Sequence, residues 1–345
     1  MKLKKIVALS LTMIMSVGIL VGCGSSNESG SASGEKISVG MITDVGGVHD
    51  ESFNQSSWEG LQSAQKELGK DKLEVKYLES KQDADYVPNI EQYIDEETDL
   101  IIGIGYKLAD AIEQAAKNYP DQQFAIVDHS YENQPENVTS LVFEGNVSGY
   151  LVGLVAGKMT ETNKVAFIGG MESVVLKEFE VGYIAGVKDA NPDAEVLVQY
   201  ANSFSDSALG KSIASAMISK GVDIVFPCAG AAGTGAIEAA KEANKMAIGV
   251  DKDQNDLAPN NVITSAMKNV NIAVSDLVKA LADGTYKAGE VKMSTLATGG
   301  VGLAPTTEKN VPADVLSFVE EKSKEVIDGK IKVPSNEEEL KAFNK

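Results

Sequence analysis

The sequence predicts an α/β protein built from two similar lobes, each a parallel β-sheet flanked by helices. Short runs of β-branched and other apolar residues alternate with stretches of helical periodicity along nearly the whole chain. Strand and helix in alternation indicate a parallel sheet with right-handed crossover connections. The alternation starts again near residue 144, and about 310 residues follow the polar N-terminal segment, which is enough for two lobes of ordinary size.

The first series of elements occupies residues 37–143. Its expected strands are 36–42, 73–78, 100–103, 123–128 and 138–143, and its expected helices are 53–68, 87–97 and 109–119. The last of these strands is expected to complete the first lobe.

The second series repeats the same unit. Its expected strands are 164–169, 195–200, 224–227 and 246–250, and its expected helices are 146–159, 174–190, 206–220 and 233–243. A further strand at 262–267 with a helix at 270–283 is assigned to the first lobe, and the segment from 291 returns to the second. The lobes are thus expected at 37–143 plus about 262–290, and at 144–261 plus about 291–345. Two such lobes with a cleft between them are typical of a periplasmic-type binding protein of type I.

The N-terminus indicates export and lipidation. Three lysines precede an apolar run at residues 6–20, which is typical of a signal peptide at 1–22 and too short for a membrane span. The ending Leu20-Val21-Gly22-Cys23 resembles a bacterial lipobox, which implies cleavage before Cys23 and lipidation of its sulfur and amine. Residues 23–36 are rich in glycine and serine and are expected to form a flexible tether. This pattern predicts a protein anchored on the extracytoplasmic face of a Gram-positive cell membrane.

Charge and cysteine content exclude several classes of partner. The formal net charge is −19, and cleavage would bring it to −22 because it removes three lysines, so nucleic acid and anionic membrane surfaces are unfavourable partners. All 31 basic residues are lysine. Sites for free amino acids, phosphates or dicarboxylates usually contain a bidentate arginine, so these ligands are disfavoured. With Cys23 lipidated, Cys228 is the one remaining thiol, and an intramolecular disulfide is excluded.

The first strand–helix junction carries a dense group of polar residues around one aromatic ring. Ligands of open α/β sheets bind outside the carboxyl ends of the strands, and this junction would place there Asp44, Asp50, Ser52, Phe53, Asn54 and Gln55. The GxxxxGK[ST] phosphate loop is absent, and two acids would repel a phosphate. We therefore expect a neutral, flat ligand with a polar edge, although an aromatic residue in the first turn of a helix is also common in a core.

Later junctions add further candidates. Asp128 and Asp251 each follow an apolar strand directly, and Phe204 lies in an otherwise polar loop. Either aspartate could instead be a helix N-cap, and Lys268 could be a solvated surface lysine. Glycines around Gly230 allow a ligand close to the backbone at a helix N-terminus, in an order that differs from GxGxxG.

Metal or cofactor chemistry is not expected. His49 and His129 have no Cys or His partner at ligand spacing, and Cys228 has no Cys-His pair to activate it.

Three motifs resemble the basic membrane protein family of lipoproteins, in which the PnrA-type members are purine nucleoside receptors of ABC importers. They are DVGGVHDESFNQSSWEG at 44–60, GVDKDQ at 249–254 and SAMKN at 265–269, and the resemblance extends from residue 37 to about 306. It implies a two-lobed receptor, without catalytic residues, that closes about a hinge on adenosine, guanosine or inosine. It also implies a monomer that delivers its ligand to a permease with ATPase subunits.

The resemblance assigns roles to particular residues. It places the nucleobase between Phe53 and Phe204, one from each lobe. The base edge would contact Asn54 and Asp128, with Asp44 and Asp50 nearby, and the ribose would contact Asp251, Lys268 and backbone N–H groups around Gly230. Carboxylates accept hydrogen bonds from the ring N–H and amino groups that purines offer.

Two other functions fit parts of the sequence. The same fold could bind a sugar or a signalling molecule, although sugar sites favour tryptophan platforms and the chain has one tryptophan, Trp58. A nucleoside hydrolase or phosphorylase is a third reading, but the acids of DVGGVHD are spaced unlike a hydrolase DxDxxxDD cluster.

Overall fold

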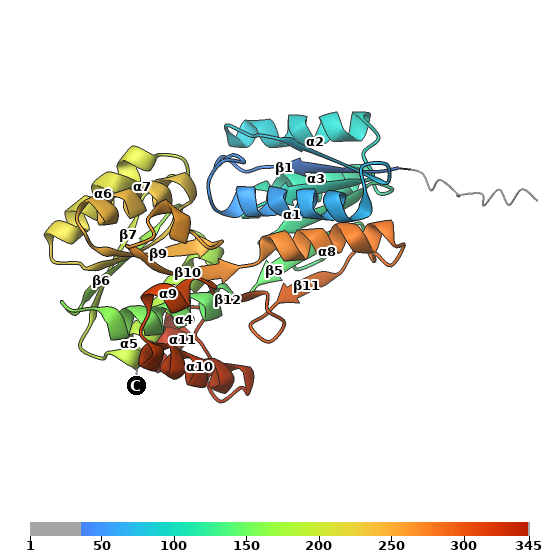
Figure 1. The fold of residues 1–345 in the computed structure, drawn as a ribbon. Coiled ribbons are helices and arrows are strands. Elements are labelled where there is room, and N and C mark those ends of the chain that lie inside the picture. Colours follow the sequence, from blue (N-terminus) through green and yellow to red (C-terminus); the bar gives the residue numbers. More distant parts are fainter. Residues whose placement is uncertain (1–35, 344–345) are drawn as a thin grey trace, which may run out of the picture. The chain divides into compact units, whose positions relative to one another are not determined.

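Two six-stranded sheets form the frame of the protein, and the computed structural model describes residues 36–343 (Figure 1). The first sheet has the order β11-β5-β4-β3-β1-β2. Its strands, paired in parallel throughout, are β1 (Ile37–Ile42), β2 (Leu73–Leu78), β3 (Leu100–Ile104), β4 (Gln123–Val127), β5 (Val138–Phe143) and β11 (Val291–Ser294). The central strands read as near-continuous apolar runs because both of their faces are buried, as in LIIGI of β3.

The second sheet has the order β12-β10-β9-β8-β6-β7. Its strands are β6 (Lys164–Gly169), β7 (Glu195–Tyr200), β8 (Ile224–Cys228), β9 (Met246–Asp251), β10 (Val262–Lys268) and β12 (Val301–Leu303). All pairs are parallel except β10 with β12. The orders β2-β1-β3-β4-β5 and β7-β6-β8-β9-β10 are the same, so the prediction of one α/β architecture used twice is confirmed.

Helices cover the sheets in packed pairs. We call the first sheet with its helices the first lobe, and these helices are α1 (Phe53–Leu68), α2 (Tyr86–Asp95), α3 (Ala109–Asn118) and α8 (Val270–Ala282), with the 3-10 turns η1 (Asp83–Asp85) and η2 (Tyr106–Leu108). The second lobe carries α4 (Gly145–Met159), α5 (Val174–Ala190), α6 (Ser207–Ser219), α7 (Gly230–Glu242), α9 (Thr307–Asn310), α10 (Ala313–Ile327), α11 (Glu337–Phe343) and the turn η3 (Asn255–Leu257). Helix α1 packs on α8, α4 on α5, and α6 on α7 (Figure 1).

The strand pairing corrects the expected lobe boundaries in two places. Strand β10 pairs with β9 in the second sheet, although the segment from 262 was assigned to the first lobe. Strand β11 pairs with β5 in the first sheet, so β5 does not complete that sheet and the segment from 291 does not return at once to the second lobe. Helix α8, between these strands, packs on α1 of the first lobe as expected. Pairing between strands distant in sequence leaves no local signal, so periodicity located the strands without identifying their sheets.

The chain therefore passes between the lobes three times. The passages lie between β5 and α4, between β10 and α8, and between β11 and β12. Each passage is short, which keeps the carboxyl ends of the strands in the two sheets close to one another and to the site described next.

The predicted signal peptide, the lipidated Cys23 and nearly all of the tether lie outside the described residues. Within residues 36–343, none of the helices has the length and hydropathy to cross a membrane.

Candidate functional site

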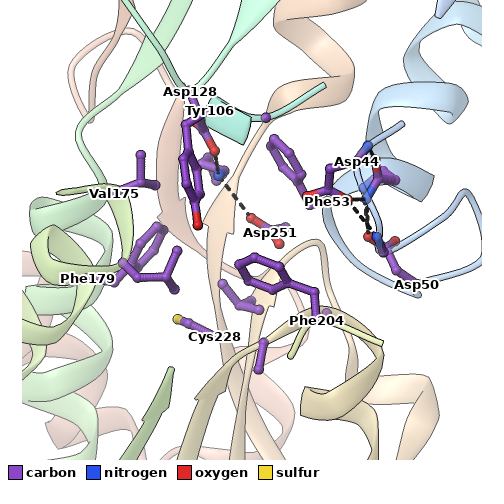
Figure 2. Close-up of a pocket in the computed structure, with 18 residues that line it drawn as sticks. Asp44, Asp50, Phe53, Tyr106, Asp128, Val175, Phe179, Phe204, Cys228 and Asp251 are labelled. Atoms are coloured by element: carbon purple, nitrogen blue, oxygen red, sulfur yellow. Dashed lines mark hydrogen bonds and ion pairs between the residues drawn. The ribbon is translucent and has the colours of Figure 1, made fainter. Parts of the chain in front are cut away.

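A cavity lies where the carboxyl ends of strands from both sheets meet, and we call it the central cavity (Figure 2). Its empty volume is about 550 Å³, a figure that includes open solvent. Nine of the ten ligand residues expected from the sequence line it, and they are Asp44, Asp50, Phe53, Asn54, Asp128, Phe204, Gly230, Asp251 and Lys268. These residues come from six separate junctions, which the fold brings together.

Gln55 does not line the cavity, which corrects its place in the expected ligand set. Its amide Nε2 donates to Glu59 Oε1 at 3.1 Å on the same helix. Residues two apart on a helix do not share a face, so Gln55 points away when Phe53 points into the cavity.

Two phenylalanine rings enter the central cavity from different lobes. Phe53 opens helix α1, and Phe204 lies in the loop after β7; Figure 2 shows both side chains directed into the cavity. Glycines make room for both rings. A Cβ at Gly105 would lie 3.3 Å from Phe53 Cε1, and a Cβ at Gly170 would overlap the ring of Phe204. Both rings are only partly buried.

A buried lysine joins carboxylates at the ends of β4 and β9. Lys268 Nζ lies 2.5 Å from Asp128 Oδ2 and 3.4 Å from Asp251 Oδ1, and its side chain is 4% exposed. Burial alone disfavours the charged amine, but the two carboxylates outweigh it and raise the pKa of Lys268 above its usual value. The same nitrogen lies 4.3 Å from the centroid of the Phe53 ring. Lys268 is therefore a fixed cation inside the cavity, and the alternative of a solvated surface lysine is wrong.

Both aspartates of this group have unusual backbone geometry. The φ angle is 63° at Asp128 and 66° at Asp251, in the left-handed region where aspartate is among the better tolerated residues. Neither residue is a helix N-cap, because β5 follows Asp128 and Gln254 is the N-cap of η3. The alternative reading of these aspartates as caps is therefore wrong.

A second buried network holds the loop between β1 and α1. Asn54 Nδ2 donates to Asp44 Oδ1 at 2.8 Å and to Asp50 Oδ2 at 3.0 Å, and Asn54 Oδ1 accepts from the Asp44 backbone N–H at 3.3 Å. Asp50 also accepts backbone N–H groups at the start of α1, from Ser52, Asn54 and Gln55. The side-chain N–H groups of Asn54 and both carboxylate oxygens of Asp50 are thus engaged in hydrogen bonds within the protein.

Asp44 differs from its neighbours because one oxygen remains available. Oδ1 accepts from Asn54 and from the Gly46 backbone N–H, whereas Oδ2 has no hydrogen-bond partner among the described residues and lies beside the position of Gly105. Burial raises the pKa of Asp44 to about 6, against the lowering effect of these hydrogen bonds. Asp44 therefore presents an acceptor to a ligand at neutral pH and loses it in mild acid.

Besides the buried Lys268–Asp128 pair, which itself joins the two lobes, three further contacts tie the lobes together beside the cavity, and we call these three the interlobe contacts. Ser52 Oγ donates to Asp251 Oδ2 at 2.5 Å, Gln254 Nε2 donates to the Glu51 carbonyl at 2.7 Å, and Lys252 Nζ lies 2.7 Å from Glu59 Oε1. One of these contacts uses the same carboxylate that meets Lys268, so the site and the lobe interface share Asp251.

Nine further residues line the cavity that the sequence did not single out, and they are Gly46, Gly105, Tyr106, Val175, Leu176, Phe179, Cys228, Ala229 and Val250. Tyr106 follows the carboxyl end of β3, where ligand-binding side chains are expected, whereas the α5 residues resemble ordinary core positions in the sequence. Cys228 is buried, and burial raises the pKa of its thiol well above the usual value, so the thiol stays neutral. Among the described residues, no cluster of three His, Cys, Asp or Glu side chains could hold a metal ion.

Two lobes with one strand order and a cavity of rings and carboxylates between their strand ends define a two-lobed substrate-binding protein. Solved structures agree with this class. An ABC transporter solute-binding protein from Aeropyrum pernix K1 superposes with a TM-score of 0.82 at 29% identity, over 89% of this chain and 98% of that one.

The chain belongs to the family described as ABC transporter substrate-binding protein PnrA-like, which it matches over residues 37–337. It is 44% identical to a CD4+ T-cell-stimulating antigen of Listeria innocua, over 96% of this chain and 99% of the relative. It is 41% identical to the ABC transporter nucleoside-binding protein BmpA of Lactococcus lactis, over 96% of this chain and 99% of that relative. The chain is therefore a substrate-binding protein of an ABC transporter, not an enzyme, and the family expected from the motifs is confirmed.

Proposed function

We propose that this protein captures purine nucleosides outside the cell and delivers them to the permease of an ABC importer. It would be a monomer held on the membrane by a lipid on Cys23. The similarity to a nucleoside-binding relative from Lactococcus lactis supports the ligand class.

The observation that carries this proposal is the pair of rings. Phe53 and Phe204 belong to different lobes and line one cavity. A planar heterocycle between them would stack on two faces, and each stack is worth roughly 1–3 kcal/mol in nucleic-acid sites. Stacking on both faces suits a nucleobase better than a free sugar, which has no aromatic face.

The polar groups fit the remaining parts of a nucleoside. Asp44 Oδ2 is an available acceptor next to Phe53, suited to a ring N–H or amino group at the base edge, with Asp128 as a second acceptor. Asp251 and Lys268 would meet the ribose, because a carboxylate can accept from two vicinal hydroxyls and an ammonium donates to oxygen. In this arrangement Asn54 and Asp50 hold Asp44 in place and do not touch the base.

The two-lobed form supports capture by closure. Three short passages join the lobes, and Asp251 takes part both in the site and in an interlobe contact. A ligand that bridges Phe53 and Phe204 would add contacts to both lobes at once and favour the closed form.

Titration calorimetry of residues 36–345 with adenosine, guanosine, inosine, cytidine and ribose tests the proposal. We expect at least one purine nucleoside to bind with micromolar or lower Kd, and ribose to bind at least a hundredfold more weakly. Absence of any purine nucleoside binding would refute it.

The same calorimetric assay tests the role of the Phe204 ring. Phe204→Ala should weaken purine nucleoside binding tenfold or more, because it removes one stacking face at roughly 1–3 kcal/mol. Phe318→Ala is the matched control, since Phe318 lies on α10 of the second lobe, is half-buried and does not line the cavity. Equal affinities for the two variants would argue for a ligand that does not stack.

A further inference from the structure

A second cavity adjoins the central one, and we call it the side cavity. Its empty volume is about 1270 Å³, part of it open solvent, and it lies between the η2–α3 segment of the first lobe and the start of α5 in the second. Tyr106, Asp128, Val175, Phe179 and Lys268 line both cavities. Figure 2 shows Tyr106, Val175 and Phe179 at the edge of the central cavity. The two cavities are therefore neighbours, with these side chains at their common boundary.

The walls of the side cavity are largely apolar and reach the surface. Val174, Val291 and Met293 line it and are 78%, 48% and 54% exposed. Ten large hydrophobic side chains are exposed in the described part of the chain, and three of them gather here. Grouped exposed apolar side chains mark contact with a ligand or partner more often than scattered ones do.

The charge inside the side cavity is negative. Asp110, Asp128 and Glu178 line it, and its basic lining residues are Lys268 and His129. Burial lowers the pKa of His129 below its usual value, so this imidazole is neutral at pH 8. Lys268 is already paired with Asp128 and Asp251, which leaves Glu178 without an ion-pair partner among the described residues. Burial, and then the charge of Asp128, raises the pKa of Glu178 to about 7. A cationic group of a ligand placed nearby would stabilise the charged form of Glu178 and offset both causes of its raised pKa.

The interlobe contacts lie at a different part of the cleft. They join Glu51, Ser52 and Glu59, around the start of α1, to the segment 251–254 after β9. None of their six residues lines the side cavity. A substituent that projects from the bound ligand into the side cavity would thus not disturb these contacts.

We propose that the side cavity is an extension of the ligand site that accepts a neutral or cationic substituent on the base edge and rejects an anionic one. The base edge is the end next to Asp128, which both cavities share. The ligand class therefore includes purine nucleosides with an alkyl or aminoalkyl group on the exocyclic nitrogen. This inference rests on the proposed nucleoside function.

Two properties of the side cavity would produce this selectivity: its apolar lining side chains and its negative charge. Alkyl carbons gain about 25 cal/mol for each Å² of apolar surface removed from water against the valine, phenylalanine and methionine side chains. An amine at the end of the chain is attracted by Glu178 and Asp110, whereas a carboxylate is repelled by them.

The experiment compares three ligands at pH 8, where Glu178 is charged. They are adenosine, N6-(6-aminohexyl)adenosine and N6-(5-carboxypentyl)adenosine, whose substituents are similar in length and opposite in charge. With the wild-type protein we expect the amine to bind within threefold of adenosine and the carboxylate at least tenfold more weakly. Glu178→Lys should reverse that order while leaving adenosine within threefold. Glu195→Lys on β7, which is exposed and lines neither cavity, is the control and should not change the order.

The outcomes separate the two proposals. If the wild-type protein binds no purine nucleoside, both the proposed function and this inference are refuted. If adenosine binds but both substituted ligands are at least a hundredfold weaker, the side cavity is not an extension of the site. If the two substituted ligands bind equally and Glu178→Lys changes neither, the charge selection is wrong. Reversal by Glu178→Lys, with adenosine binding retained, supports the inference.

Discussion

Neighbouring acidic residues take different roles in this site because their oxygens are occupied differently. Asp50 receives three backbone N–H groups and the Asn54 amide, so it organises the start of α1. Asp44 receives two donors on one oxygen and keeps the other available. The sequence treats the two aspartates alike, and only the hydrogen-bond partners distinguish a structural carboxylate from a binding one.

The pH dependence of binding follows from Asp44. Its pKa of about 6 lies above the usual value, because burial disfavours the charged form more than its hydrogen bonds favour it. If the ionised Oδ2 accepts from the purine, affinity should be constant above pH 7 and fall about tenfold between pH 7 and pH 5, as the carboxylate protonates. Calorimetry at pH 5, 6, 7 and 8 measures this, and Asp44→Asn should bind more weakly with a shallower pH profile. An increase in wild-type affinity towards pH 5 would mean that protonated Asp44 donates to the ligand.

Gly170 controls the position of the Phe204 ring. A Cβ at residue 170 would overlap the ring, so Gly170→Ala should displace Phe204 from the cavity and weaken purine nucleoside binding at least fivefold with little loss of stability. Gly302→Ala is the control, because a Cβ there has no atom within 4 Å. Calorimetry together with urea denaturation separates the two effects. Unchanged affinity in Gly170→Ala would show that the ring can shift without consequence.

The sequence could predict the polar and aromatic site residues but not their surroundings. Phe204 and Asp128 lie in loops after strands, Asp251 ends β9 and Phe53 opens α1, and at such strand ends these residue types have few structural reasons to occur. Phe179 could not be found this way, because it lies within α5 in a pattern that any buried helix would show. Gln55 was misplaced because it is adjacent in sequence to site residues while lying on another face of α1.

At the scale of elements, local periodicity located most helices and strands closely. The expected helices at 53–68 and 174–190 coincide with α1 and α5. The errors concern strand pairing. Strand β10 was predicted as a strand but assigned to the first lobe, and the segment that contains β11 was assigned to the second. Strand β11 is a half-exposed edge strand of four residues, and its sequence VKMS carries no information about which sheet it extends.

Helices α4 and α5 pack unusually closely, which the regular spacing of glycines along α4 makes possible. A Cβ at Gly153 or Gly186 would lie less than 3.0 Å from the backbone of the facing helix. Backbone atoms cannot move aside as a flexible side chain can. The contact therefore fixes α5, whose first turns carry Val175 and Phe179 into the central cavity.

Gly186→Ala tests this packing. Overpacking of a close contact costs typically about 1–3 kcal/mol, so the free energy of unfolding should fall by about that amount, measured by urea denaturation. Gly302→Ala should change it by less than about 0.5 kcal/mol, as expected for a substitution without steric conflict. A neutral result for Gly186→Ala would mean that the two helices can separate at little cost.

At the scale of the whole molecule, ligand capture depends on the balance between open and closed lobes. Three short passages allow the lobes to rotate, and the interlobe contacts favour the closed form. The ionic member of these contacts, Lys252 with Glu59, is partly exposed, with 23% and 42% of the side chains accessible. Exposed pairs of this kind contribute about 0.2–1 kcal/mol, which corresponds to an effect of about 1.4-fold to fivefold on ligand release.

Charge reversal isolates that contribution. Lys252→Glu and Glu59→Lys should each increase the dissociation rate of a purine nucleoside about twofold to fivefold, because each places like charges across the interface. The double variant restores an opposite pair and should return the rate towards that of the wild type, in stopped-flow measurements at low salt. Lys211→Glu is the control. It disrupts contacts with Glu238 and Glu242 inside the second lobe and should leave the dissociation rate unchanged.

The differences in dissociation rate between the variants and the wild type should shrink in 0.5 M salt, because screening weakens exposed ion pairs. Additive rates in the double variant would show that this pair does not act across the interface and that closure depends on the buried contacts of Ser52 and Gln254.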